Sequence, residues 1–302
     1  SDGRTVASGG TDRKTILWDT WRHVSNSRRA EATESPFRMA FSPNGAFEAE
    51  GYDDDALMLT RRDRATDVSE PIHLVPPLPT AGPVSNVAFS RDSRFLVSSA
   101  RDLTVRRHDL ANVSPDATPP IFTTDRCADW SRPKGAEVTA VAVSAGGNLV
   151  AAAVKADHTK GAILIWNGSN GAPLCDPPLS CPDDEVFALE FSPDGKHLAT
   201  GGDAEYAVIW NIAEPSAPSS IRCPELHTGR IRGIAFDPSG KSIVTASGDN
   251  TLILWNAHDG SQLGPALTAH LGPVVSAVFS PDGKLLASGS DDTAVILWDL
   301  KT

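Results

Sequence analysis

The sequence predicts an all-β protein, a seven-bladed β-propeller of four-stranded antiparallel blades in which the first and last blades are incomplete. Three observations support this fold class. A turn containing Pro and Gly recurs along the chain, and an apolar run that often ends in Trp recurs after it. The units repeat at roughly 42 to 54 residues, close to the period of propeller blades. Apolar, β-branched runs alternate with turn residues, and no helical period extends over a useful length.

The repeated turn marks the boundary between the first two strands of each unit. It appears as FSPNG at Phe41, FSPDG at Phe191, FDPSG at Phe236 and FSPDG at Phe279, with weaker copies FSRDS at Phe89 and VSAGG at Val143. The apolar run appears as ILWDT at Ile16, ILIWN at Ile163, VIWNI at Val208, LILWN at Leu252 and ILWDL at Ile296, with degenerate copies LMLTR at Leu57 and VRRHD at Val105. One small sheet cannot bury its own faces, but several sheets packed around an axis cover one another.

The two ends of the chain have incomplete units. The sequence contains seven second strands and seven third strands, but six inner and six outer strands. The first unit has no inner strand and the last has no outer strand. We therefore expect residues 1–302 to form a single propeller domain cut from a longer polypeptide. A six-bladed ring with unpaired ends is the less favoured alternative.

The spacing and the Trp-Asp endings resemble the WD-repeat β-propeller family over essentially the whole chain. The resemblance implies a hydrogen-bonded network in each blade, because a buried indole N–H needs an acceptor and an Asp can fix the imidazole tautomer. It assigns to this network His227, Thr245, Asp249 and Trp255 in the sixth unit, His270, Ser288, Asp292 and Trp298 in the last, and Ser8, Asp12 and Trp18 in the first.

A hydrolase triad is the alternative interpretation of these His, Ser and Asp residues. It is disfavoured because the set repeats at blade spacing and includes Trp, and because the sequence has no G-x-S-x-G elbow. The middle units lose the network in part. The fifth keeps Thr200 and Trp210, whereas the third keeps Ser98 and Asp102 but has His108 at the Trp position.

Long insertions are the candidate binding segments, since function tends to lie on loops held by a rigid scaffold. By resemblance they approach the face that bears the His and Asp of the network, here called the loop face. The candidate binding residues are Arg101, Arg126, Trp130, Arg132, Lys134 and His158. An exposed Trp among Arg and Lys is typical of a protein-interface hot spot. Trp130 covering a blade edge is the alternative.

The favoured function is a non-catalytic scaffold, or a sensor domain in signalling, that docks a protein, a peptide or other domains of its parent chain. The stretch from Asp259 to Gly283 resembles WD-repeat regions of bacterial regulatory proteins. An enzyme with a central-channel site is one alternative, disfavoured because the inner strands carry few titratable groups. A purely structural spacer or oligomerisation module is the other.

Composition restricts the partners further. The formal charge of −11 argues against nucleic acid, because phosphate neutralisation needs a basic face. No apolar run approaches the ~18 residues that a membrane span requires. The four cysteines form no C-x-x-C pair, and the remaining histidines have no partner at metal-ligand spacing. We expect no metal, no cofactor, and free thiols in a cytoplasmic protein, with a disulfide between Cys175 and Cys181 as the less favoured alternative.

Overall fold

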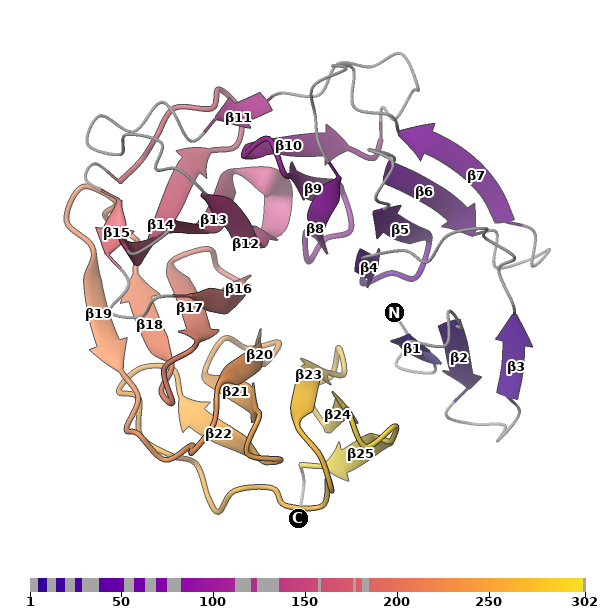
Figure 1. The fold of residues 1–302 in the computed structure, drawn as a ribbon, viewed down its shortest axis with the longest axis vertical. Helices are drawn as coiled ribbons and strands as arrows, with labels where there is room; N and C mark the ends of the chain where they lie inside the picture. Colours follow the sequence, from indigo (N-terminus) through magenta and orange to yellow (C-terminus); the bar gives the residue numbers. More distant parts are fainter. Residues whose placement is uncertain are drawn as a thin grey trace. The chain divides into compact units, whose positions relative to one another are not determined.

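The computed structural model describes residues 5–9, 15–19, 25–28, 38–51, 57–62, 69–74, 83–111, 121–123, 136–156, 159–175, 178–180 and 185–300. The chain divides into two compact units, one formed by residues 1–32 with 186–302 and the other by residues 33–185. Within the described ranges, the chain forms seven antiparallel sheets and one short 3₁₀ turn, Ala145–Gly147. The all-β prediction is therefore confirmed (Figure 1).

The unit of residues 33–185 contains three four-stranded sheets, each ordered as its strands occur in the chain. Their strands are β4 (Arg38–Phe41), β5 (Phe47–Gly51), β6 (Leu57–Arg62) and β7 (Ser69–Leu74); β8 (Val84–Phe89), β9 (Phe95–Ala100), β10 (Thr104–Asp109) and β11 (Ile121–Thr123); and β12 (Glu137–Val143), β13 (Leu149–Ala156), β14 (Thr159–Asn167) and β15 (Leu179–Ser180).

The other unit contains one four-stranded and three three-stranded sheets. Their strands are β1 (Thr5–Gly9), β2 (Thr15–Asp19) and β3 (Ser25–Arg28); β16 (Val186–Phe191), β17 (His197–Gly202), β18 (Val208–Asn211) and β19 (Ser219–Arg222); β20 (Ile231–Phe236), β21 (Ser242–Ser247) and β22 (Leu252–Asn256); and β23 (Val274–Phe279), β24 (Leu285–Ser290) and β25 (Val295–Asp299).

The described strands include six inner, seven second and seven third strands, as the sequence predicts. The predicted outer strand of the sixth unit is reduced to two isolated bridges, Trp255 with Gln262 and Leu252 with Leu267. This segment carries Gly264 at φ +80° next to Pro265, and proline has no backbone N–H to donate to a strand ladder. The sixth sheet therefore has a short, irregular outer edge.

The repeated Ser-Pro-Asp-Gly turn forms through side-chain contacts that are local in sequence. In the last sheet, Ser280 Oγ donates to Asp282 Oδ1 at 2.7 Å and accepts from the backbone N–H of Leu285 at 2.9 Å. Gly283 closes the turn by donating its N–H to the carbonyl of Ser280 at 2.9 Å, with φ at +70°. Glycine adopts this left-handed conformation without the Cβ clash of other residues. The Ser-Pro-Asp-Gly motif therefore predicts the hairpin that joins the inner strand to the second strand.

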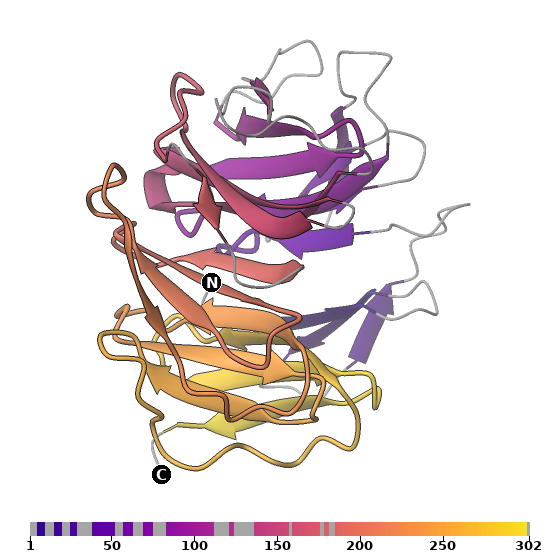
Figure 2. The ribbon, with the colours of Figure 1, turned by 60° about the vertical axis from the view of Figure 1, so that its left-hand side comes forward.

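Packing between successive sheets builds the core. Ala235 and Val244 of the sixth sheet lie in one apolar cluster with Val274, Phe279 and Leu286 of the last sheet. Strands β16, β20 and β23 contact one another in succession, and Figure 2 shows the sheets coloured orange to yellow stacked face to face. Each face of a sheet is too small to stabilise itself, so the contact between neighbours holds the stack together.

Candidate functional site

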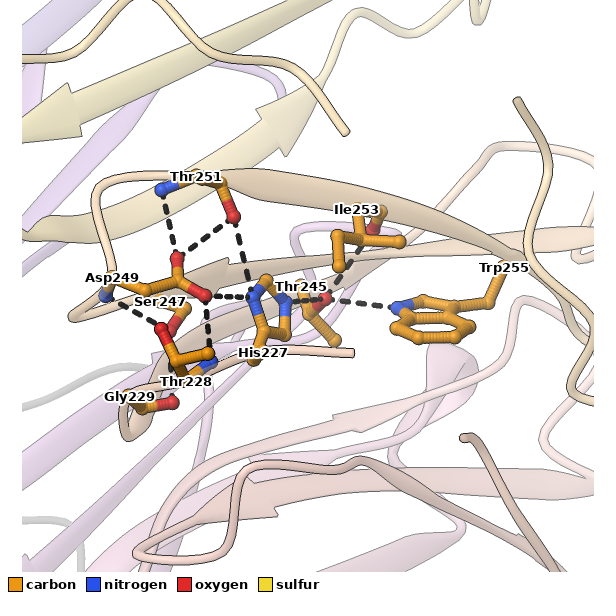
Figure 3. Close-up of polar contacts among 9 residues, drawn as sticks. All are labelled: His227, Thr228, Gly229, Thr245, Ser247, Asp249, Thr251, Ile253 and Trp255. Carbon is orange, nitrogen blue, oxygen red and sulfur yellow. Dashed lines mark hydrogen bonds and ion pairs between the residues drawn. The ribbon is translucent and has the colours of Figure 1, made fainter. Parts of the chain in front are cut away.

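The polar network of the sixth sheet joins four side chains that are far apart in the sequence. His227 Nδ1 lies 2.8 Å from Asp249 Oδ2, and His227 Nε2 lies 2.7 Å from Thr245 Oγ1. Trp255 Nε1 donates to the same hydroxyl at 2.9 Å. Figure 3 shows Thr245 between the imidazole and the indole, with Asp249 on the far side of the imidazole. With the Asp249 carboxylate accepting from Nδ1–H, Nε2 is left to accept from the hydroxyl, so every polar group has a partner.

The last sheet repeats this geometry. His270 Nδ1 lies 3.0 Å from Asp292 Oδ2, and Nε2 lies 2.7 Å from Ser288 Oγ. Trp298 Nε1 donates to Ser288 at 2.9 Å. In both sheets the imidazole and indole centroids are 6.4 Å apart in an edge arrangement. Ser288 is only 2% exposed and its hydroxyl is held by both rings, so a substrate has no approach to it as a nucleophile.

Each network carboxylate also fixes the chain at the loop face. Asp292 Oδ2 accepts from the backbone N–H of Leu271 at 2.8 Å, and Oδ1 accepts from that of Ala294 at 2.8 Å. Ser290 Oγ donates to the carbonyl of Gly272 at 2.9 Å. The segment before the inner strand is thus tied to the turn between the second and third strands. Loops held in this way present their side chains in a fixed arrangement.

The sixth sheet has the same ties and one more. Asp249 accepts from the backbone N–H of Thr228 at 3.0 Å and from the N–H and hydroxyl of Thr251 at 2.9 and 2.7 Å. Burial raises the pKa of Asp249, but the hydrogen bonds from Thr251, Thr228 and His227 outweigh it, so the pKa lies below its ordinary value. Burial lowers the pKa of His227 despite the opposing effect of Asp249. At neutral pH the pair is a carboxylate beside a neutral imidazole.

The other sheets keep only parts of the network. In the fifth, Trp210 Nε1 donates to Thr200 Oγ1 at 3.2 Å. In the third, His108 Nε2 lies 3.2 Å from Ser98 Oγ and takes the position that Trp255 has in the sixth. Burial, followed by the charge of Arg106, lowers the pKa of His108 to about 4. His108 is therefore neutral at physiological pH.

Arg106 is a buried charged residue of the third sheet that the repeat pattern does not assign to the network. It lies two residues before His108, where the sixth sheet has Ile253, and it is only 2% exposed. Its Nη2 atom is 3.7 Å from Asp102 Oδ2. Burial lowers the pKa of Arg106, and Asp102 opposes this shift. The Arg106 guanidinium is therefore the positively charged group next to Asp102 in this sheet. The only signal in the sequence is the charged run VRRHD, where the other units have apolar residues.

The predicted binding residues are only partly covered by the structure. Arg101 is exposed in the turn after β9, and its N–H donates to the carbonyl of Pro83 at 3.1 Å. Asp291 makes the same contact with Pro273 at 2.9 Å in the last sheet, so the two residues have equivalent positions at the loop face. The other candidates, Arg126, Trp130, Arg132, Lys134 and His158, lie outside the described residues.

The structure describes only part of the network that is predicted for the first unit. Ser8 is in β1 and Trp18 in β2, and Val6 pairs with Trp18 in the register that Leu286 and Trp298 adopt in the last sheet. Asp12 lies outside the described residues.

Ion pairs add further links at the loop face within each unit. Arg230 Nε lies 2.9 Å from Asp203 Oδ1, linking the turn of the fifth sheet to the segment before β20. Arg232 Nη1 lies 3.4 Å from Asp291 Oδ2, and both side chains are about half exposed. In the other unit, Lys155 Nζ lies 2.8 Å from Glu185 Oε2. Exposed pairs of this kind contribute little stability, so their main effect is to set the charge pattern of the surface.

The described residues show neither a metal-binding cluster nor a helix of membrane-spanning length. No group of three or more His, Cys, Asp and Glu side chains in these ranges is arranged to hold a metal ion. No helix among them is long and apolar enough to cross a membrane. Cys223 is a buried free thiol, and burial raises its pKa to about 12. A thiol with so high a pKa is a poor nucleophile at neutral pH.

Comparison with known families gives one match. The model described as WD domain, G-beta repeat matches residues 75–109, 175–211, 219–256 and 261–299. These four matches fall on the third, fifth, sixth and last sheets. No curated protein matches the sequence.

Proposed function

Because the chain belongs to the WD-repeat family, we propose that its seven sheets are the blades of one propeller over residues 1–302, which docks a protein or peptide on its loop face. WD40 repeats generally act in protein–protein interaction and not in catalysis. The module is a scaffold or sensor domain in cytoplasmic signalling, and its partner is a separate protein or another domain of the parent chain. Neither nucleic acid nor membrane is the partner.

The observation that carries this proposal is the rigid support of the loop face. Asp249 and Asp292 each hold the segment before an inner strand and the turn after a second strand, and both are held by a buried His. Preorganised loops lose little conformational entropy when a partner binds. A network that fixes loops but buries its hydroxyls is suited to binding rather than to chemistry.

The charge pattern of the loop face supports two contrasting binding regions. Between residues 186 and 302, the turns between second and third strands carry Asp203, Glu205, Asp249, Asp291 and Asp292 and no Lys or Arg. The candidate residues of the other unit are basic by sequence, from Arg101 to Lys134. Opposite charges on the partner would steer its approach and set its orientation.

Peptides selected from a displayed library on the immobilised chain test this proposal. Binding of each selected peptide is measured by fluorescence anisotropy to wild type and to a variant with Arg101→Glu, Trp130→Ala and Arg132→Glu. We expect at least tenfold weaker binding and an unchanged melting temperature. The matched control reverses two exposed charges away from the loop face, Arg61→Glu with Lys196→Glu. Equal affinity of wild type and the loop variant would reject the assigned face.

Two other functions remain as alternatives to this proposal. A spacer or oligomerisation module would select no peptide that depends on the loop residues. An enzyme with a central-channel site would need convergent titratable groups on the inner strands. Of the described inner strands in the unit of residues 186–302, only Glu190 and Arg232 are charged, and Glu190 accepts from the backbone N–H of Phe236 at 3.0 Å.

A further inference from the structure

Leu271 is a large apolar side chain that projects from the loop face. It directly follows the network residue His270 and is 91% exposed. Among the large apolar side chains of the described residues it has the greatest exposure, and the next, Val278, is 59% exposed. An exposed leucine is ordinary on a protein surface, so its role depends on how it is held and on what surrounds it.

The exposure of Leu271 belongs to its position in the loop. The matched residue of the sixth sheet is Thr228, which follows His227 and is also exposed. The sixth sheet has a neighbour on each side, since β20 contacts both β16 and β23. Figure 3 shows Thr228 beside the carboxylate of the network, as Leu271 is in the last sheet. A residue at this position therefore remains exposed when both neighbouring sheets are present.

Hydrogen bonds fix the backbone around Leu271. Its N–H donates to Asp292 Oδ2 at 2.8 Å, and the carbonyl of the next residue, Gly272, accepts from Ser290 Oγ at 2.9 Å. A Cβ at Gly272 would lie 3.0 Å from the backbone N of Asp292, so the loop packs closely on the turn after the second strand. Because this backbone is already ordered, a partner that contacts Leu271 orders little more than one side chain.

The charges next to Leu271 favour one class of partner. Asp291 lies in the turn that holds the Leu271 loop, and its side chain is 54% exposed. Its contact with Arg232 is long, at 3.4 Å, and an ion pair this exposed is weak. The turns at residues 248–251 and 291–294 together carry three carboxylates and neither Lys nor Arg. A basic side chain is attracted to this region and an acidic one is repelled.

We propose that Leu271 is the apolar anchor for a basic segment of a partner protein, in which a bulky apolar side chain packs on Leu271 and a neighbouring Lys or Arg pairs with Asp291. This inference rests on the proposed docking function of the loop face. Apolar burial supplies affinity, whereas the charges set the orientation of the segment and the rate of association. The formal charge of −11 favours a basic partner over a second copy of this acidic chain.

A displayed library of random peptides, selected on the 302-residue chain and depleted on the Leu271→Thr variant, tests this inference. Threonine is the residue of the sixth sheet at the matched position. The hydrogen bond to Asp292 uses the backbone of Leu271, so this variant should keep the melting temperature of wild type. We expect the enriched peptides to carry a bulky apolar residue beside Lys or Arg.

Fluorescence anisotropy on the enriched peptides measures each contribution. Leu271→Thr should weaken binding about tenfold, as expected for an interface hot spot. Asp291→Asn should weaken it about threefold and reduce its dependence on NaCl concentration, as expected for a charge at the rim of an interface. The matched control is Leu263→Thr, which changes a leucine that is 45% exposed at the outer edge of the sixth sheet and should bind as wild type.

Four outcomes would overturn the inference. These are no enriched peptide, peptides that bind Leu271→Thr as tightly as wild type, Leu271-dependent peptides without Lys or Arg, and equal binding to wild type and Asp291→Asn. Self-association of the chain that is lost in Leu271→Thr, measured by analytical ultracentrifugation, would make a second copy the occupant and would also overturn it.

The variant with Arg101→Glu, Trp130→Ala and Arg132→Glu separates this inference from the proposed function. Peptides that depend on those three residues but not on Leu271 would reject the inference and leave the proposed function standing. Leu271-dependent peptides that bind this variant as tightly as wild type would support the inference and reject the three residues.

Discussion

The Nε2 atom of His270 lies 2.7 Å from Ser288 Oγ, and the same hydroxyl accepts the indole N–H of Trp298. One buried hydroxyl thus links a loop before the inner strand to a partly buried aromatic ring on the third strand. The other ring nitrogen of His270 contacts Asp292, which fixes the loop face. Several measurable consequences follow from such links.

Removing the imidazole should destabilise the fold. We expect His270→Ala to lower the free energy of unfolding by ~1–3 kcal/mol, because Ser288 and Asp292 lose a buried partner. Urea denaturation followed by tryptophan fluorescence measures it. His258→Ala, at an exposed position, is the control and should leave the midpoint unchanged. A neutral His270→Ala would show that the network does not contribute to stability.

The turn after Asp292 holds a strained residue. Thr293 has φ at +68°, whereas Asn250 has φ at +72° at the equivalent position of the sixth sheet. A β-branched residue adopts this conformation at a cost, and Asn tolerates it. We expect Thr293→Asn to raise the free energy of unfolding by about 0.5–1 kcal/mol. The reciprocal Asn250→Thr should lower it by a similar amount. Thermal denaturation measures both variants, and a less stable Thr293→Asn together with a more stable Asn250→Thr would contradict this account.

The buried Arg106 depends on Asp102 for charge compensation. Asp102→Ala leaves a guanidinium that is 2% exposed without its carboxylate, and we expect a loss of about 3 kcal/mol. Adding Arg106→Ile, which installs the residue type of the sixth sheet, should recover most of this loss. A double-mutant cycle in urea gives the coupling energy. Additive effects of the two changes would show that the residues are not coupled.

The His108 imidazole makes stability depend on pH. Its pKa falls from an ordinary value of 6.5 to about 4 in the folded protein, because burial and Arg106 disfavour the cation. The unfolded chain therefore binds more protons between pH 6.5 and 4, and the stability contributed above pH 6.5 is lost as the pH falls through this range. We expect His108→Phe to show a smaller fall in melting temperature between pH 7 and 4.5 than wild type. Parallel pH profiles would contradict the buried, neutral imidazole.

Much of the architecture could be predicted from the sequence. The all-β class, the inner, second and third strands, and the family were all predicted from repeated turns and apolar runs. Turns such as the one from Ser280 to Gly283 are held by hydrogen bonds between residues two to five positions apart. One short stretch of sequence therefore specifies each of these turns. The members of the two complete networks were also identifiable, because His227 and His270 recur at identical spacing from their hydroxyl, Asp and Trp.

The tertiary structure decided what packs on each face. The row Ala235–Val244 and the row Val278–Ala287 read alike in sequence, yet Ala235 and Val244 are buried whereas Val278 is 59% exposed. Similarly, the pattern places Arg106 on the face that holds Ile253 in another sheet, but only the fold shows the guanidinium buried near Asp102. The alternation along a strand determines which residues share a face. Whether that face is covered depends on a neighbouring sheet distant in sequence, and strand alternation carries no information about that neighbour.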